Sequence, residues 1–183
     1  MISAPSGTGK STIINEIFNR GDIDMQFSVS ATNRQPRPGE TDGEDYHFLT
    51  TEQFRSAIEN DEFVEWEEVY PGRYYGTLKS EINDKCLAGH NIVLDIDVKG
   101  ALNVKKMYGD MARTIFIMPP SIESLRTRLE GRGTESPEAI ASRLARAEFE
   151  LGFSKDFDDV VVNDNLEDAV SDTAGKINAF LNS

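Results

Sequence analysis

The sequence has 183 residues, of which 38% are hydrophobic and 28% are charged, and this balance excludes a collagen-like, low-complexity or fully disordered chain. The length favours one domain of ordinary size with a substantial core. Lysine and arginine number 19 against 32 aspartate and glutamate residues, which gives a net charge of −13. We therefore expect no general binding of nucleic acid or anionic membranes, since such binding needs clustered cations.

The cysteine content and the lack of long apolar runs bear on where the protein works. The chain has 1 cysteine, Cys86, so it cannot form an intrachain disulfide. A single thiol is also too few for a zinc site built from cysteines. No apolar run approaches the length that spans a bilayer, and the first residues do not form a signal segment. These features predict a soluble cytoplasmic protein.

Short runs rich in β-branched and aromatic residues alternate with longer helical patterns along the chain. In chain order, the predicted elements are helix 11–20, strand 25–31, helix 51–59, strand 63–69, helix 78–88, strand 92–96, helix 100–108, strand 114–118, helix 122–131, helix 137–152, strand 160–162 and helix 167–181. This alternation predicts an α/β fold with a mainly parallel sheet and flanking helices. The stretch 32–75 is rich in polar turns and aromatic residues and is interpreted as an inserted β-rich lobe.

The segment 4–11, Ala-Pro-Ser-Gly-Thr-Gly-Lys-Ser, matches the P-loop pattern except that alanine replaces the first glycine. Gly7 and Gly9 have no Cβ, so the backbone can curl with its N–H groups inward and phosphate can approach closely. The next helix directs its positive dipole end at the same place. Lys10 would reach the β- and γ-phosphates, and the Ser11 hydroxyl would bind Mg²⁺. The alternative is a glycine-rich turn before an ordinary helix.

Two arginines follow the second predicted strand in a loop that prolines stiffen. Pro36 and Pro38 restrict the backbone there, so Arg34 and Arg37 are held where both can fork onto one phosphate group. A local arginine pair is informative in so acidic a chain. The alternative is a solvated loop with surface ion pairs.

The strand 92–96 leads into two carboxylates at its C-terminal end, where open α/β sheets bind their ligands. Asp95 and Asp97 are predicted to point to the same face, because strand side chains alternate with period two. One could hold Mg²⁺ through water while the other faces the acceptor. The alternative is a pair of acidic residues without a role.

Taken together, several motifs resemble those of the bacterial guanylate kinases over nearly the whole chain. The matching parts are Ala-Pro-Ser-Gly-Thr-Gly-Lys-Ser (4–11), Thr-Asn-Arg-Gln-Pro-Arg-Pro-Gly-Glu (32–40), Gly-Glu-Asp-Tyr (43–46), Phe-Val-Glu-Trp (63–66), Tyr-Tyr-Gly-Thr (74–77), Leu-Asp-Ile-Asp (94–97), Leu-Glu-Gly-Arg-Gly (129–133) and Val-Val-Asn-Asp (161–164). Each is weak alone, and their order and spacing make the resemblance specific.

This resemblance implies transfer of the γ-phosphoryl group of ATP to GMP, with Mg²⁺, in purine nucleotide metabolism. It implies a P-loop kinase core formed by residues 1–31, 78–125 and 155–183, a GMP-binding lobe at 32–77 and a helical lid at 126–154. The partners would be ATP and GMP, with no nucleic acid or membrane, and the chain would be a monomer or homodimer.

The resemblance also implies a role for individual residues, carried over position by position. The ATP-binding set would be Ser6, Gly7, Thr8, Gly9, Lys10, Ser11, Thr12 and Asn163. The GMP-binding set would be Ser30, Arg34, Arg37, Glu40, Tyr46, Glu65, Tyr75, Thr77 and Asp97. Ser11 and Asp95 would hold the metal, and Lys10, Arg34, Arg132 and Arg143 would act in catalysis.

Glycines and arginines in the predicted lid would let it close over the nucleotides. Gly131 and Gly133 can absorb backbone rotation, and by resemblance Arg132 and Arg143 would then meet phosphate charge. Arg128 and Arg146 would be helpers. The alternative is ion pairing between exposed side chains at i and i+4, such as Arg146 with Glu150.

Two other functions compete with this interpretation. Guanylate-kinase-like domains of scaffold proteins bind phosphorylated partners after losing nucleotide-binding residues, whereas here Gly9, Lys10 and Ser11 are intact. A P-loop kinase for another phosphorylated acceptor is the second alternative. The chain also departs from the family at its start, where only residues 1–3 precede the loop, and we expect this short first strand to reduce stability.

Overall fold

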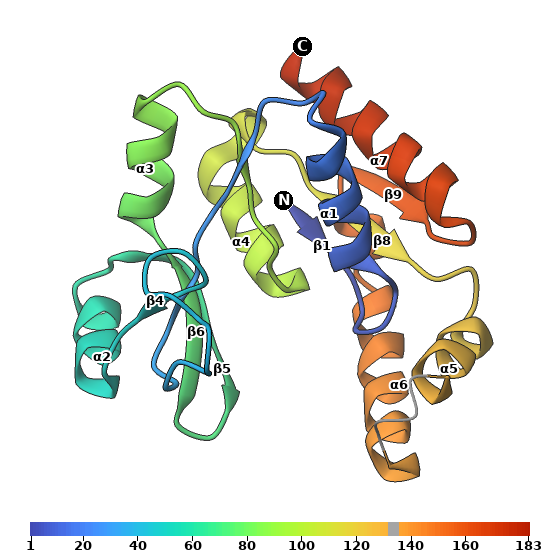
Figure 1. Ribbon diagram of the computed structural model, residues 1–183, viewed down its shortest axis with the longest axis horizontal. Helices are drawn as coiled ribbons and strands as arrows, with labels where there is room; N and C mark the ends of the chain where they lie inside the picture. Colours follow the sequence, from blue (N-terminus) through green and yellow to red (C-terminus); the bar gives the residue numbers. More distant parts are fainter. Residues whose placement is uncertain (132–135) are drawn as a thin grey trace. The chain divides into compact units, whose positions relative to one another are not determined.

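Figure 1 shows the computed structural model of the chain, which describes residues 1–131 and 136–183. The chain divides into two units, each with strands and helices of its own. Unit 1 consists of Met1–Ile23 and Ile96–Ser183, and unit 2 consists of Asp24–Asp95. In the described ranges no helix is both long enough and apolar enough to cross a bilayer.

Unit 1 contains a parallel sheet with the strand order β1 (Ile2–Ser3), β8 (Ile115–Met118) and β9 (Asp159–Val162). The central strand β8 is almost wholly apolar because both of its faces are covered, and Phe116 is fully buried. The helices of unit 1 are α1 (Lys10–Arg20), α4 (Val98–Tyr108), α5 (Ile122–Glu130), α6 (Pro137–Leu151) and α7 (Leu166–Leu181), with short 3-10 helices at Gly109–Met111 and Ser154–Asp156. Helix α1 packs against α7, and α4 lies against β1.

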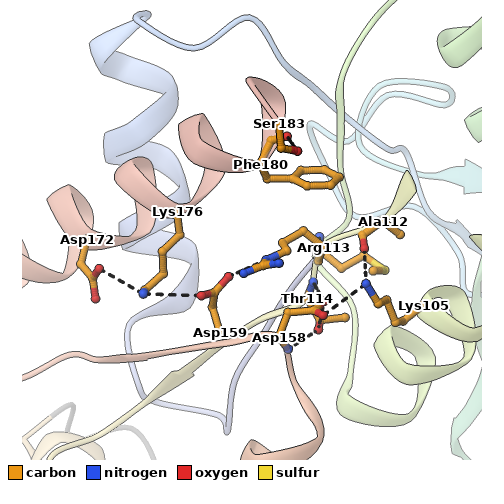
Figure 2. Close-up of polar contacts among 11 residues, drawn as sticks. Lys105, Ala112, Arg113, Thr114, Asp158, Asp159, Asp172, Lys176, Phe180 and Ser183 are labelled. Atoms are coloured by element: carbon orange, nitrogen blue, oxygen red, sulfur yellow. Dashed lines mark hydrogen bonds and ion pairs between the residues drawn. The ribbon is translucent and has the colours of Figure 1, made fainter. Parts of the chain in front are cut away.

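Charged side chains connect the start of β8 and β9 to helix α7, as Figure 2 shows. The Arg113 Nε atom donates to Asp159 Oδ2 at 2.7 Å, and Lys176 Nζ of α7 lies 3.6 Å from Asp159 Oδ1. Next to them, the backbone N–H and hydroxyl of Thr114 both donate to Asp158 Oδ2 at 2.8 Å. These contacts fix the end of the sheet at which β8 and β9 begin.

Unit 2 contains two sheets. Strand β2 (Gln26–Phe27) pairs in parallel with β7 (Ile92–Val93). A four-stranded mixed sheet has the order β4 (His47–Phe48), β3 (Ala31–Thr32), β6 (Arg73–Leu78) and β5 (Phe63–Tyr70). Its helices are α2 (Thr51–Glu59) and α3 (Lys79–Leu87).

The apolar core of unit 2 forms around Phe54 of α2, which is fully buried. The Phe54 ring stacks on Phe63 with centroids 4.4 Å apart and on Tyr74 with centroids 5.5 Å apart. Because Phe63 belongs to β5 and Tyr74 to β6, this stack fastens α2 to the hairpin. The core therefore fixes the hairpin that carries several of the predicted site residues.

The seven predicted helices are all present in the described ranges, and their ends agree to within two residues. Local signals in the sequence explain this agreement. The Thr50 side chain accepts from the Gln53 backbone N–H at 3.1 Å, and the Gln53 side chain accepts from the Thr50 N–H at 2.7 Å, which completes a capping box before α2. Helix α1 ends at Arg20 and is capped by Gly21, whose φ of 67° lies in the left-handed region that glycine tolerates.

Two of the predicted strands are wrong in extent. The strand 25–31 is two strands, β2 and β3, because Ser28 N–H still bonds to the carbonyl of Val93 whereas Val29 N–H bonds to the carboxylate of Glu81 at 2.9 Å. The strand 92–96 ends at Val93, since Asp97 already caps helix α4. The predicted fold class is confirmed, because the sheet of unit 1 is parallel and helices flank it.

Candidate active site

The loop between β1 and α1 has the backbone conformation that its glycines predicted. Gly7 and Gly9 have φ angles of 91° and 93°, in the left-handed region that strongly favours glycine. A side chain at either position would also clash with a neighbouring side chain. A Cβ at Gly7 would lie 2.7 Å from Leu129 Cδ2, and one at Gly9 would lie 2.6 Å from Asn163 Nδ2. The left-handed conformation therefore favours glycine at both positions, and any other residue would also require Leu129 or Asn163 to move.

Hydrogen bonds hold the loop in this shape. Thr8 is fully buried, and its hydroxyl donates to the carbonyl of Pro5 at 2.8 Å. The Asn163 side chain, from the end of β9, donates to the carbonyl of Thr8 at 2.6 Å. Helix α1 starts at Lys10 directly after Gly9, so the loop and the positive end of the helix dipole form one anion-binding concavity.

The other residues that the resemblance assigned to ATP binding lie in or next to this loop. Lys10 is half-buried at the first position of α1, and Ser11 and Thr12 are exposed in its first turn. Ser6 is exposed in the loop, and its hydroxyl accepts from Arg143 Nη1 at 2.6 Å. Arg143 lies on α6, so the structure brings a predicted lid arginine to the loop.

The other predicted lid residues have different outcomes. Arg132 lies outside the described residues, as does Gly133. Arg146 donates to Glu150 at 2.8 Å, which is the i, i+4 ion pair that the sequence left as the alternative. Arg128 donates to the carbonyl of Asn163 at 2.8 Å and thereby contacts the loop region from helix α5.

The Arg34 side chain in unit 2 is fixed by a carboxylate and by aromatic rings. Its two terminal nitrogens donate to the two oxygens of Glu40 at 2.6 and 2.7 Å, and its Cζ atom lies 4.8 Å from the centroid of the Tyr46 ring. Glu40 also accepts from the backbone N–H of Arg37 at 2.7 Å. Hydrogen bonds from Arg34, and then from the Arg37 backbone, lower the pKa of Glu40 from 4.5 to about 2.

Sequence reasoning missed one arginine of this region. Arg34, Arg37 and Arg73 all line a cavity of about 410 Å³ in unit 2. Arg73 comes from the β5–β6 hairpin, and its Cζ atom lies 5.8 Å from the ring centroid of Tyr70. The clue in the sequence was a cation directly after the Pro-Gly turn at 71–72.

The candidate base-reading residues of the hairpin lie side by side. Glu65 of β5 pairs with Thr77 of β6 across the antiparallel ladder, and the Thr77 hydroxyl donates to Glu65 Oε1 at 2.6 Å. Tyr75, also on β6, meets the Tyr46 ring edge-on with centroids 5.9 Å apart. Ser30 is half-buried just before β3, and its carbonyl accepts from the N–H of His47 at 2.9 Å. The structure thus gathers Ser30, Tyr46, Glu65, Tyr75 and Thr77 in one unit.

Asp95 and Asp97, the predicted pair of carboxylates, follow strand β7, which ends at Val93. Buried Leu94 and Ile96 alternate with exposed Asp95 and half-buried Asp97, as period two predicts, although these residues lie outside the strand. Asp97 caps α4 by accepting from the N–H of Gly100 at 2.7 Å, and Asp95 is exposed. Residues 1–131 and 136–183 contain no cluster of three or more His, Cys, Asp or Glu that could hold a metal. The exposed Ser11 hydroxyl beside the loop suits Mg²⁺, which binds through one or two protein groups together with phosphates and water.

A glycine loop that joins a parallel strand to the start of a helix defines the class of this protein. It is a P-loop α/β protein in which unit 2, Asp24–Asp95, is inserted between the two segments of unit 1. Comparisons with known proteins identify its family. The sequence model of the family described as Guanylate kinase matches residues 1–179. The chain belongs to the guanylate kinase family.

Relatives and solved structures agree with this membership. The chain is 53% identical over 182 residues to a protein named guanylate kinase from Bacteroides thetaiotaomicron, covering 100% of this chain and 89% of that protein. It is 52% identical over 183 residues to a guanylate kinase from Salinibacter ruber, covering 100% and 96%. The crystal structure of guanylate kinase from Anaplasma phagocytophilum matches with a TM-score of 0.71 and 33% identity, over 99% of this chain and 82% of that one. A shikimate kinase structure from Bacteroides thetaiotaomicron, at 14% identity and a TM-score of 0.52 over 100% and 96%, is similar in fold alone.

Proposed function

We propose that this protein transfers the γ-phosphoryl group of ATP to GMP, giving ADP and GDP, with Mg²⁺ and within purine nucleotide metabolism. Family membership supports an ATP:GMP phosphotransferase. The observation that carries the choice of acceptor is the paired arrangement of Glu65 and Thr77 on the hairpin of unit 2.

The chemistry of guanine explains why this pair suits it. Guanine presents two adjacent donors, N1–H and the N2 amino group, and a carboxylate such as Glu65 can accept both. The hydroxyl of Ser30 can donate to O6, and the hydroxyl of Thr77, which donates to Glu65 in the structure, would turn to O6 once Glu65 accepts from the guanine. Adenine has no N1–H and carries an amino group in place of O6, so it would leave the Glu65 carboxylate desolvated and unpaired. Sites of this kind discriminate by roughly 10⁴-fold or more.

The acceptor phosphate needs charge and orientation rather than a base. A phosphate monoester has its second pKa near about 6, so the phosphate of GMP is largely a dianion at pH 7 and is already a nucleophile. Arg34, Arg37, Tyr46 and Tyr75 would hold it. Glu40 takes one N–H from each terminal nitrogen of Arg34, and because a guanidinium has five N–H groups, others would be available to the phosphate.

The donor would bind at the loop of unit 1. Backbone N–H groups of the loop and the start of α1 would hold its phosphates, and Lys10 would contact the β- and γ-phosphates. Ser11 would hold Mg²⁺, with Asp95 assigned to the metal by resemblance. When bound, the metal would neutralise phosphate charge. Arg143, which contacts the loop at Ser6, and Arg132 would add positive charge around the transferred group.

Replacing the base-reading carboxylate tests this proposal. Glu65→Gln keeps the size of the side chain but removes the charge and the second acceptor, so kcat/KM for GMP should fall by about 100-fold or more. The matched control is Glu59→Gln, an exposed carboxylate at the end of α2 in the same unit, which should turn over GMP normally. Circular dichroism should show both variants folded. Turnover of GMP by Glu65→Gln at the rate of the unsubstituted protein would contradict the proposed acceptor.

A further inference from the structure

Asn163 lies where it can control the phosphate loop. It directly follows β9, is 5% exposed, and its backbone N–H bonds to the carbonyl of Met118 at 2.8 Å, so its position is set by the sheet. Its side-chain nitrogen donates to the carbonyl of Thr8 across a separation of 155 residues. This contact uses one of the two N–H groups of the side-chain amide on the loop itself, whereas the resemblance placed Asn163 only in the ATP-binding set.

We propose that Asn163 and Arg128 are positioning residues that set the direction of the peptide between Thr8 and Gly9. In a trans peptide the C=O and N–H groups point in opposite directions. A carbonyl of Thr8 held on the Asn163 side therefore turns the N–H of Gly9 to the other side. The left-handed conformation of Gly9 then leads directly into α1, so this N–H belongs to the concavity that receives phosphate.

Arg128 reinforces the same peptide from helix α5. One terminal nitrogen donates to the carbonyl of Asn163 at 2.8 Å, and the other lies 3.5 Å from the carbonyl of Thr8. Its charge faces the negative ends of these carbonyl dipoles, which favours their present direction. On the same helix, Leu125 and Leu129 are the side chains that a Cβ at Gly7 would meet. Helix α5 thus contacts the loop at two consecutive residues, Gly7 and Thr8.

The fit between Gly9 and Asn163 supports a positioning role. A Cβ at position 9 would lie 2.6 Å from the Asn163 side-chain nitrogen, closer than nonbonded atoms approach. The amide therefore occupies the space that any other residue at position 9 would need. A side chain packed this closely against the backbone of the loop acts on the loop itself, and its effect should not depend on which base the nucleotide carries.

The experiment distinguishes an effect on phosphate binding by the loop from an effect on binding of the base. It rests on the proposed function, because the loop is taken to bind ATP. Calorimetry measures the affinity of the full chain, with magnesium chloride, for ATP and for inorganic tripolyphosphate, which has no base. Asn163→Ala should weaken both by the same factor, about tenfold, because one hydrogen bond to a buried carbonyl is lost. GMP affinity should stay unchanged. Asn178→Ala, an exposed asparagine of α7, is the control and should bind both anions normally.

A second variant covers the case in which Asn163→Ala does not fold. Arg128→Gln removes the guanidinium and leaves Asn163 in place, and it should weaken both anions severalfold by the same factor. Where both single variants fold, the double variant should lose less than the product of the two single losses, since both act on one peptide. Weaker ATP binding with unchanged tripolyphosphate binding, or no change for either anion, would overturn the inference. An unsubstituted chain that bound neither anion would instead contradict the proposed function, and the inference with it.

Discussion

Glu40 shows how one residue in the acceptor loop can organise its neighbours. Resemblance assigned it to GMP, whereas in the structure its carboxylate binds the Arg34 fork and the backbone N–H of Arg37. Arg34 is thereby held in one orientation against the Tyr46 ring, with its side chain 7% exposed. The role that the geometry supports for Glu40 is to orient an arginine that would otherwise sample many conformations.

The lowered pKa of Glu40 predicts a pH dependence of stability. The folded-state pKa of about 2 lies below the ordinary value of 4.5, so the carboxylate stabilises the folded state above about pH 4.5. This contribution is lost as the pH falls from 4.5 toward 2. The difference in melting temperature between the unsubstituted chain and Glu40→Gln should therefore be constant from neutral pH down to the ordinary pKa and should then shrink.

Thermal melts followed by circular dichroism at a series of pH values measure this difference. Glu44→Gln, an exposed carboxylate of the same loop, is the control and should show little difference at any pH. A Glu40→Gln difference that stayed constant down to about pH 3 would contradict the paired state of the carboxylate.

At the scale of elements, helices were predictable and strands less so. The signals for α2 and α6 are local, since the capping residues Thr50 and Ser136 each bond to a backbone N–H three positions later. The extent of a strand depends instead on partners remote in sequence. Nothing near position 29 indicates that its N–H bonds to Glu81, 52 residues away, and this contact divides the predicted strand 25–31. The two-residue β1 is likewise defined by its pairing with β8.

The capping box before α2 gives a stability prediction for this element. Thr50→Ala removes the side-chain acceptor for the Gln53 N–H, and the free energy of unfolding should fall by about 1 kcal/mol. Thr50→Ser keeps the hydroxyl and is the matched control, with little loss expected. Urea unfolding of both variants measures the difference. An alanine variant as stable as the serine variant would show that the cap contributes nothing.

At the scale of the whole molecule, the candidate site contains contacts between residues that are far apart in the sequence. Asn163 meets Thr8 across 155 positions and Arg143 meets Ser6 across 137. Composition and periodicity could indicate a phosphate loop and an α/β fold, but not which remote side chains complete the loop. The resemblance named Asn163 and Arg143, and the structure adds the contacts that they make. Arg73 was missed because its approach to Arg34 and Arg37 depends on how the hairpin packs.

We propose that one chain uses the phosphate loop for ATP and unit 2 for GMP. ADP formation from ATP and Mg²⁺ with GMP, AMP, CMP or UMP as the acceptor tests this directly, with Lys10→Ala as the inactive control. We predict turnover that depends on GMP, is slower with the other acceptors by roughly 10⁴-fold or more, and is abolished by the Lys10 substitution. A folded protein that formed no ADP with any acceptor, or that used AMP as well as GMP, would contradict the account.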